Sequence, residues 1–146
     1  MRVFLDTNVL AAAAATRGLC ADVFREVLAC HELLISAQVL SELKRVLRSK
    51  FGIGQDLVEA YILLLQQDSI IVEVIEIPKI RLRDKDDLGI LGAAVGGGAD
   101  VLVTGDKELL DLHRIENVEI LSPRQFWEKV KTRKGRDGRG ERREPC

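Results

Sequence analysis

The sequence predicts an α/β fold, a three-layer α/β/α sandwich with a central, mostly parallel five-stranded sheet. The chain has 146 residues, of which 47% are hydrophobic, and this suits one domain that buries its own core. Short runs rich in β-branched residues alternate with segments of helical period along most of the chain. Such alternation is typical of βαβ units, whose strands pair in parallel and whose helices cover both faces of the sheet.

Five segments are expected to form the strands. The first, Arg2–Leu5, is short and apolar, as a strand covered on both faces should be. The segment Ile70–Ile75 is enriched in β-branched residues, and Pro78 ends it because proline cannot donate to a sheet ladder. The other strands are expected at Leu33–Ile35, Val101–Val103 and Val118–Leu121.

Six segments are expected to form helices. In Ala37–Arg48 the apolar residues recur at helical spacing, and Ser36 precedes them as an N-cap. Ser122 and Pro123 supply an N-cap and a proline in the first helical position for the last helix, Ser122–Val130. The remaining helices are expected at Cys20–His31, Gln55–Gln67, Asp84–Val95 and Lys107–Leu112.

The composition changes after Val130. Residues 131–146 contain no aliphatic or aromatic side chain and carry a net charge of +4, which leaves −5 on residues 1–130. We therefore predict a domain over 1–130 and a basic disordered C-terminal tail over 131–146. Two interpretations of the tail stay open: it attracts a phosphate backbone, or it is a solubilising end without further function.

No targeting or membrane segment is expected. The longest stretch without a charged side chain, Leu88–Ala99, has 12 residues, fewer than the roughly 20 that cross a bilayer. Asp6 interrupts the first apolar run before the apolar core of a signal peptide could form. We therefore expect a cytoplasmic protein without a membrane partner.

Composition also restricts the chemistry. Two histidines and three cysteines argue against metal sites built from those residue types. Neither histidine stands in a setting typical of a catalytic triad. If the chain is an enzyme, carboxylates must carry most of the reaction.

Two aspartates directly follow strands. Asp6 follows the first strand, and Asp106 follows Val101–Val103 at the end of Thr104-Gly105-Asp106. In open parallel sheets, ligands bind beyond the carboxyl ends of the strands where the strand order reverses. If these two strands are neighbours, both carboxylates face one crevice.

Helices can bring further acids to the same crevice. Asp84 and Asp87 are three residues apart at the start of one helix, and Glu42 lies on the flank of an apolar stripe. Each acid alone has a simpler interpretation that stays open. These are an N-cap or Asx-turn for Asp6 and Asp106, a partner of the helix dipole for Asp84, Asp86 and Asp87, and an exposed helical acid for Glu42. Four converging carboxylates would repel one another unless a cation such as Mg²⁺ or Mn²⁺ joined them.

The order and spacing of five motifs resemble the PIN-domain nuclease family. The motifs are Leu5-Asp6-Thr7-Asn8-Val9-Leu10; Ile35-Ser36 followed by Glu42; Asp84–Asp87 running into an alanine-containing helix; Thr104-Gly105-Asp106-Lys107; and Ser122-Pro123-Arg124-Gln125-Phe126. The resemblance covers Arg2–Val130 and is strongest to the VapC-like branch, the toxin components of toxin–antitoxin systems. It implies a PIN-like fold and a Mg²⁺- or Mn²⁺-dependent endoribonuclease that cleaves single-stranded RNA. It also implies homodimers and inhibition by a small antitoxin protein.

The resemblance also implies roles for individual residues. It makes Asp87 the third acid because Ile90, Leu91 and Ala94 follow at the family's spacing, with Asp84 as second choice. The implied catalytic acids are Asp6, Glu42, Asp87 and Asp106, and the implied metal ligands are Asp6, Asp87, Asp106 and Asp84. Apart from the resemblance, Asn8 and Thr104 are candidates for orienting carboxylates or water, or are turn residues, and Lys107 is a candidate contact to phosphate, or a solvated surface charge.

Two other functions stay open. One is a catalytically silent PIN-like module that binds RNA or a protein partner. The other is a HAD-like phosphatase, although such enzymes need a second acid where this chain has Asn8. The glycines Gly89, Gly92 and Gly96–Gly98 disfavour a helix, and they either permit close packing or loosen the site.

Overall fold

A central sheet organises the protein, which we describe over residues 1–138 of a computed structural model. Within this range the sheet has six strands in the order β3-β2-β1-β4-β6-β5. All neighbouring strands are parallel except β5 and β6, which are antiparallel. The bounds are β1 Arg2–Leu5, β2 Glu32–Ser36, β3 Ile70–Val72, β4 Val101–Val103, β5 Arg114–Ile115 and β6 Val118–Leu121.

The mostly parallel α/β/α architecture is confirmed, and the predicted number of five strands is corrected to six. The added strand, β5, has two residues and pairs with β6 across a tight turn. Two residues are too few to produce a recognisable alternation of apolar and polar side chains. Glu116 in this turn has a φ of 48°, a left-handed conformation that side chains other than glycine seldom adopt.

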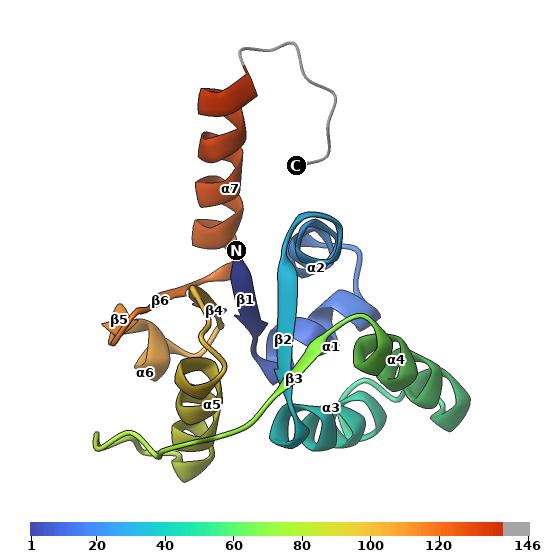
Figure 1. Cartoon of the computed structure of the whole chain (residues 1–146). Helices are drawn as coiled ribbons and strands as arrows, with labels where there is room; N and C mark the ends of the chain where they lie inside the picture. The colour runs from blue at the N-terminus through green and yellow to red at the C-terminus, as the bar shows by residue number, and fades with distance from the viewer. Residues whose placement is uncertain (139–146) are drawn as a thin grey trace.

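Helices cover both faces of the sheet. Figure 1 shows the strands between α1, α2 and α4 on one side and α5 on the other. The bounds are α1 Thr7–Ala15, α2 Leu19–Cys30, α3 Ala37–Ser49, α4 Gln55–Gln67, α5 Lys85–Gly96, α6 Lys107–Leu110 and α7 Pro123–Gly138. None of the helices within residues 1–138 is both long and apolar enough to cross a membrane.

The sequence patterns did not predict α1. Its residues are mainly alanine, which has the highest intrinsic helix propensity but leaves no amphipathic stripe to recognise. Asp6 begins the helix by accepting a hydrogen bond from the Thr7 backbone N–H. The hydroxyl of Tyr61 in α4 donates a hydrogen bond to the Leu10 carbonyl at 2.9 Å, which holds the middle of α1 in place.

The last helix starts as predicted and ends later. Ser122 Oγ accepts from the Gln125 backbone N–H, and Gln125 Oε1 accepts from the Ser122 N–H, which together form a capping box. The helix continues to Gly138 rather than ending at Val130, and Figure 1 shows it projecting from the sheet beside the N-terminus. The rest of the predicted tail, 139–146, lies outside the described residues, so its disorder and its role stay predictions.

Residues 73–84 leave the sheet earlier than predicted. β3 ends at Val72, and the chain then runs along α5 (Figure 1) instead of forming a strand to Ile75. A Cβ on Gly92 would lie 2.9 Å from Val74 Cγ1, and one on Gly96 would lie 2.7 Å from the Glu73 carbonyl oxygen. The glycines of α5 therefore permit close packing, here against this segment.

Candidate functional site

The acids of the predicted crevice follow the carboxyl ends of β1 and β4, and we keep the name crevice for this place at the sheet edge. These strands are neighbours in the sheet, with Leu5 in register with Val103. From β1 the chain continues to β2 on one side, while β4 is followed by β6 on the other. The strand order therefore reverses between β1 and β4, which is where open α/β sheets bind ligands. Asp6 and Asp106 follow these two strands as expected.

The hydroxyl of Thr104 connects the two aspartates. Thr104 is fully buried. Its Oγ1 donates to Asp6 Oδ2 at 2.7 Å and accepts from the Asp106 backbone N–H at 3.0 Å. One neutral side chain thus orients the Asp6 carboxylate and fixes the backbone that carries Asp106.

Three of the candidate acids are N-caps. The side chains of Asp6, Asp84 and Asp106 accept hydrogen bonds from backbone N–H groups at the start of α1, α5 and α6. The capping interpretation is therefore confirmed for Asp6 and Asp106, and Asp84, which was interpreted as a partner of the helix dipole, is an N-cap as well. Capping also fixes each carboxylate at the end of its helix, which is compatible with a further role in the crevice.

Asp87 has no such structural explanation. It lies in the first turn of α5, and its Oδ2 atom is buried without a hydrogen-bond partner. Burial raises the pKa of Asp87 to about 7, with further contributions from the charges of Asp106, Asp84 and Asp6 and from a side-chain hydrogen bond with Asp106. Buried polar atoms are rarely left unpaired in folded proteins. This buried, unpaired oxygen, on a carboxyl group that interacts with the charges of three other acids, is a candidate ligand for a cation.

Asp6 belongs to the same electrostatic cluster. It is 8% exposed, and burial raises its pKa. Hydrogen bonds from Thr104 and Thr7 oppose that shift, and the charges of Glu42 and Asp106 add to it. The four predicted catalytic acids therefore interact electrostatically across the crevice, although Glu42 acts on Asp6 rather than on Asp87.

Glu42 reaches the crevice from α3 and is half-buried. Its Oε1 accepts from the Thr7 hydroxyl at 2.8 Å, and its Oε2 accepts from Gln38 Nε2 at 3.1 Å. Gln38 also donates to the Asp86 backbone carbonyl at 2.9 Å. A Cβ on Gly89 would lie 2.2 Å from Gln38 Oε1. The glycine therefore makes room for the side chain that links α3 to the start of α5.

Some predicted residues stay outside this network. Asp86, Asn8 and Lys107 are exposed. Within the part of the chain whose side chains are described, none of the three side chains forms a hydrogen bond or ion pair with the carboxylates of the crevice. The exposure of Asp86 agrees with its interpretation as a first-turn acid of the helix, and the predicted substrate or orienting roles of Asn8 and Lys107 stay predictions.

Three residues that support the site were not predicted from the sequence. Thr7 and Gln38 hold Glu42, and Glu108 accepts from the Arg83 backbone N–H at 3.0 Å, which anchors the segment that leads to Asp84. The spacing of Gln38 and Glu42, four residues apart on one helix, is a signal that could have indicated the first pair. The Glu108 contact joins residues 25 apart, and no local pattern indicates it.

The acids match a hard divalent cation in donor chemistry. Carboxylate oxygens are the ligands that Mg²⁺ and Mn²⁺ prefer, and the Oδ2 atom of Asp87, which has no hydrogen-bond partner, is available to bind such an ion. Within residues 1–133, no three His, Cys, Asp or Glu side chains already surround one point closely enough to hold a metal ion. Binding would therefore require side chains such as that of Asp87 to move towards the ion.

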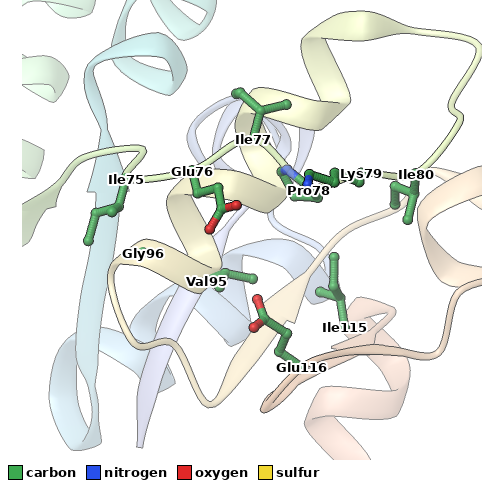
Figure 2. A pocket seen from close by; sticks show the side chains of 10 residues that line it. All are labelled: Ile75, Glu76, Ile77, Pro78, Lys79, Ile80, Val95, Gly96, Ile115 and Glu116. Atoms are coloured by element: carbon green, nitrogen blue, oxygen red, sulfur yellow. The ribbon is translucent and has the colours of Figure 1, made fainter.

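A separate pocket of about 480 Å³ lies along the outer side of α5. Figure 2 shows it between the segment Ile75–Ile80, the end of α5 at Val95 and strand β5 at Ile115, with the carboxyl groups of Glu76 and Glu116 directed towards it. It contains none of the predicted site residues. The crevice at the sheet edge and this pocket are distinct.

Fold and site together define an α/β protein with a carboxylate cluster at the switch point of a parallel sheet. The family model described as PIN domain matches residues 2–108. The chain belongs to the PIN domain family. No curated protein matches the chain at a significant level.

Two solved structures share the fold. One is VapBC2 from Rickettsia felis bound to a DNA fragment from its promoter, with 16% identity, a TM-score of 0.60, and coverage of 84% of this chain and 98% of that chain. The other is VapBC-1 from nontypeable Haemophilus influenzae, with 20% identity, a TM-score of 0.58, and coverage of 85% and 99%. At these identities the likeness concerns the fold.

Proposed function

We propose that this chain is a divalent-metal-dependent endoribonuclease that hydrolyses phosphodiester bonds of single-stranded RNA. The observation that carries the proposal is the buried, unpaired Oδ2 atom of Asp87 beside three other carboxylates. The ionised form of such a carboxyl group is unfavourable without a cation, whereas a bound cation would stabilise it and could take part in catalysis. Membership of the PIN domain family supports the same activity.

Asp6, Asp87 and Asp106 would hold the metal, with Asp84 as an additional acid. When bound, Mg²⁺ or Mn²⁺ supplies positive charge that stabilises the anionic transition state of phosphodiester hydrolysis. Because Thr104 and the helix caps fix Asp6 and Asp106, these two acids provide the rigid part of the site.

Glu42 would position the attacking water and accept its proton. Thr7 and Gln38 each donate to one of its carboxylate oxygens, so its orientation is set before substrate binds. In-line attack of the water on phosphorus breaks the bond to the 3′ oxygen. The products are then a 5′-phosphate and a 3′-hydroxyl.

The experiment is cleavage of labelled single-stranded RNA by the purified protein with Mn²⁺. Activity is expected with the metal and is expected to be lost with EDTA or in Asp6→Asn. Cleavage that persists in both controls would come from a contaminant and would contradict the proposal.

The two alternatives make different predictions. The family match gives no support to a HAD-like phosphatase. A silent PIN-like module would bind RNA or protein without needing metal. Calorimetric titration with Mn²⁺ separates the cases, because a silent module is expected to show no binding that depends on Asp87.

We also propose that the chain is the toxin of a toxin–antitoxin pair. The support is the shared fold of the two VapBC structures together with the family match. The test is expression in a bacterial host, alone and together with any small protein that the neighbouring gene encodes. Growth arrest that Asp87→Asn abolishes and the neighbouring protein prevents is expected; growth unaffected by the wild-type chain would contradict this role.

Self-association is proposed through an apolar strip, which we define as Ile70, Ile71, Val74, Ile75 and Ile77. These side chains are exposed, with Ile75 at 81% and Ile77 at 52%, and such clusters are typical of interfaces. Acids at 73 and 76 precede bases at 79, 81 and 83 in the same segment. Two copies related by a twofold axis can therefore place the acidic half of one against the basic half of the other.

Sedimentation velocity tests this interface. The wild-type chain is expected to form dimers and Ile75→Ser/Ile77→Ser to form monomers. Leu57→Ser/Leu63→Ser is the matched control, because it removes two exposed leucines from α4 instead. If both variants form monomers to the same extent, or if both stay dimeric, the apolar strip is not the dimer interface.

A further inference from the structure

A groove extends from the candidate site along α3. A hollow of about 460 Å³ beside Glu42 and another of about 400 Å³ further along α3 share two lining residues, Ser41 and Arg45. The first hollow lies between α3 and the start of α5 and the second between α3 and α4, so the two are adjacent on the exposed side of α3, and we call this surface the α3 groove. We define it by Gln38 and Glu42 at one end, Ser41 and Arg45 in the middle, and Lys44 and Arg48 at the other.

Helical periodicity explains why these residues share a surface. Gln38, Ser41, Arg45 and Arg48 follow at steps of three, four and three residues, which places them on one side of an α-helix. The buried residues Val39, Leu43 and Leu47 occupy the other side. Gln38 and Arg48 are separated by about 15 Å along the helix axis.

The far end of the groove is basic and its cations are free. Lys44, Arg45 and Arg48 are exposed, and none forms an ion pair among residues whose side chains are described. The acid that lines this end, Glu59 of α4, accepts a hydrogen bond from Gln55. Lys44 and Arg48 against this one carboxylate leave a net charge of +1 at the far end, with Arg45 in the middle of the groove.

The charge changes sign along the groove. At the end beside the crevice, Glu42 and Asp86 balance Arg45 and Lys85, whereas the far end is positive. A polyanion with its reacting phosphate at the acids would therefore have its next phosphates beside Arg45 and Arg48. Guanidinium groups suit this position because they bind phosphate oxygens in a bidentate manner.

We propose that the α3 groove binds the sugar–phosphate backbone of single-stranded nucleic acid on one side of the cleaved bond. The proposal rests on the proposed nuclease function in one respect: the end of the groove at Glu42 is the end next to the cleaved bond. Arg45 and Arg48 act as binding residues that hold the strand in register with the acids. They have no part in bond breaking.

The experiment measures binding of a labelled twelve-nucleotide oligouridylate in EDTA, so that cleavage does not interfere. The test variant is Arg45→Gln/Arg48→Gln. The matched control is Arg17→Gln/Arg124→Gln, which removes the same charge from two exposed arginines outside the groove. Fluorescence anisotropy gives Kd at several salt concentrations, and unfolding curves establish that both variants fold.

The test variant is expected to weaken binding about tenfold at low salt. The slope of log K against log salt is expected to fall by about 1.4, since each phosphate contact to a single strand contributes roughly 0.7. The control is expected to match the wild-type slope. In the Mn²⁺ assay the loss should appear mainly in KM, and a dinucleotide, too short to reach Arg48, should lose less than the long substrate.

Two outcomes overturn the proposal, and a third separates it from the proposed nuclease function. A test variant with the wild-type affinity and slope excludes the groove while leaving metal-dependent cleavage intact. Competition by polyglutamate as effective as that by oligouridylate would show a site for acidic polypeptides instead. If the oligonucleotide binds through the groove but is not cleaved with Mn²⁺, the groove stands and the nuclease function fails.

Discussion

Replacing Asp87 by asparagine is expected to stabilise the metal-free protein. In the wild type, burial and the neighbouring carboxylates raise the pKa of Asp87 from 3.8 to about 7. A carboxyl group with a raised pKa stabilises the fold while it is protonated, and this contribution is lost as the pH rises through the folded-state pKa. Asparagine has nearly the same shape and never ionises, so Asp87→Asn avoids the loss.

The structure sets the size of the effect. A difference between 3.8 and about 7 corresponds to about 4 kcal/mol if the whole shift is expressed as stability. Asp87 is only half-buried, so screening by solvent reduces this value. We expect Asp87→Asn to exceed the wild type by about 1–2 kcal/mol at pH 8.

Urea denaturation in EDTA at a series of pH values measures the effect. The advantage of Asp87→Asn should shrink as the pH falls through 7 and be smallest near pH 4. Asp86→Asn is the matched control, because its exposed carboxyl group lies one residue away, and it should behave as the wild type. Excess Mn²⁺ should raise the Tm of the wild type and raise that of Asp87→Asn less.

Two results would refute this reasoning. If Asp87→Asn is less stable than the wild type at pH 8 in EDTA, the carboxylate has a favourable partner and is not an unmatched ligand. If Mn²⁺ stabilises the two proteins equally, Asp87 does not bind the metal.

Other variants test the remaining contacts. Thr104→Val removes a hydrogen bond to a carboxylate and one from a backbone N–H and should destabilise the protein by about 2–4 kcal/mol in urea, whereas Thr104→Ser should retain most of the stability. Gly89→Ala should leave the Tm unchanged or slightly raised but lower RNA cleavage severalfold, because the new Cβ displaces Gln38; unchanged cleavage would mean that Gln38 does not position Glu42. Tyr61→Phe loses the bond to a carbonyl of α1 and should lower the free energy of unfolding by about 1 kcal/mol.

Much of the fold could be predicted because its signals are local. The helix at α3 shows its apolar stripe and its Ser36 cap in the sequence, and both are present in the structure. The strand β5 and the helix α1 were missed because two residues and a run of alanines carry no periodic pattern. The end of β3 depends on contacts with the glycines of α5, which no sequence window contains.

The site was predictable to a smaller extent. Placing Asp6 and Asp106 after strands was sufficient to bring them to one edge once β1 and β4 proved to be neighbours. The partners of Glu42 were not foreseen, since Thr7 lies 35 residues away in the chain. The sequence also could not distinguish an acid that caps a helix from one without a hydrogen-bond partner, because that distinction depends on burial and on hydrogen bonds in the folded structure.

The hydroxyl of Thr104 restrains Asp6 and Asp106 but not Asp87, so the site has a rigid part and a part that can move. The hydroxyl donates a hydrogen bond to Asp6 and accepts one from the Asp106 backbone N–H. The Thr104 side chain therefore cannot rotate about χ1 without breaking both hydrogen bonds. The Oδ2 atom of Asp87 has no such restraint. The arrival of a cation should therefore be accommodated by a χ rotation of one side chain on α5, while the sheet edge acts as a fixed template against which that acid closes.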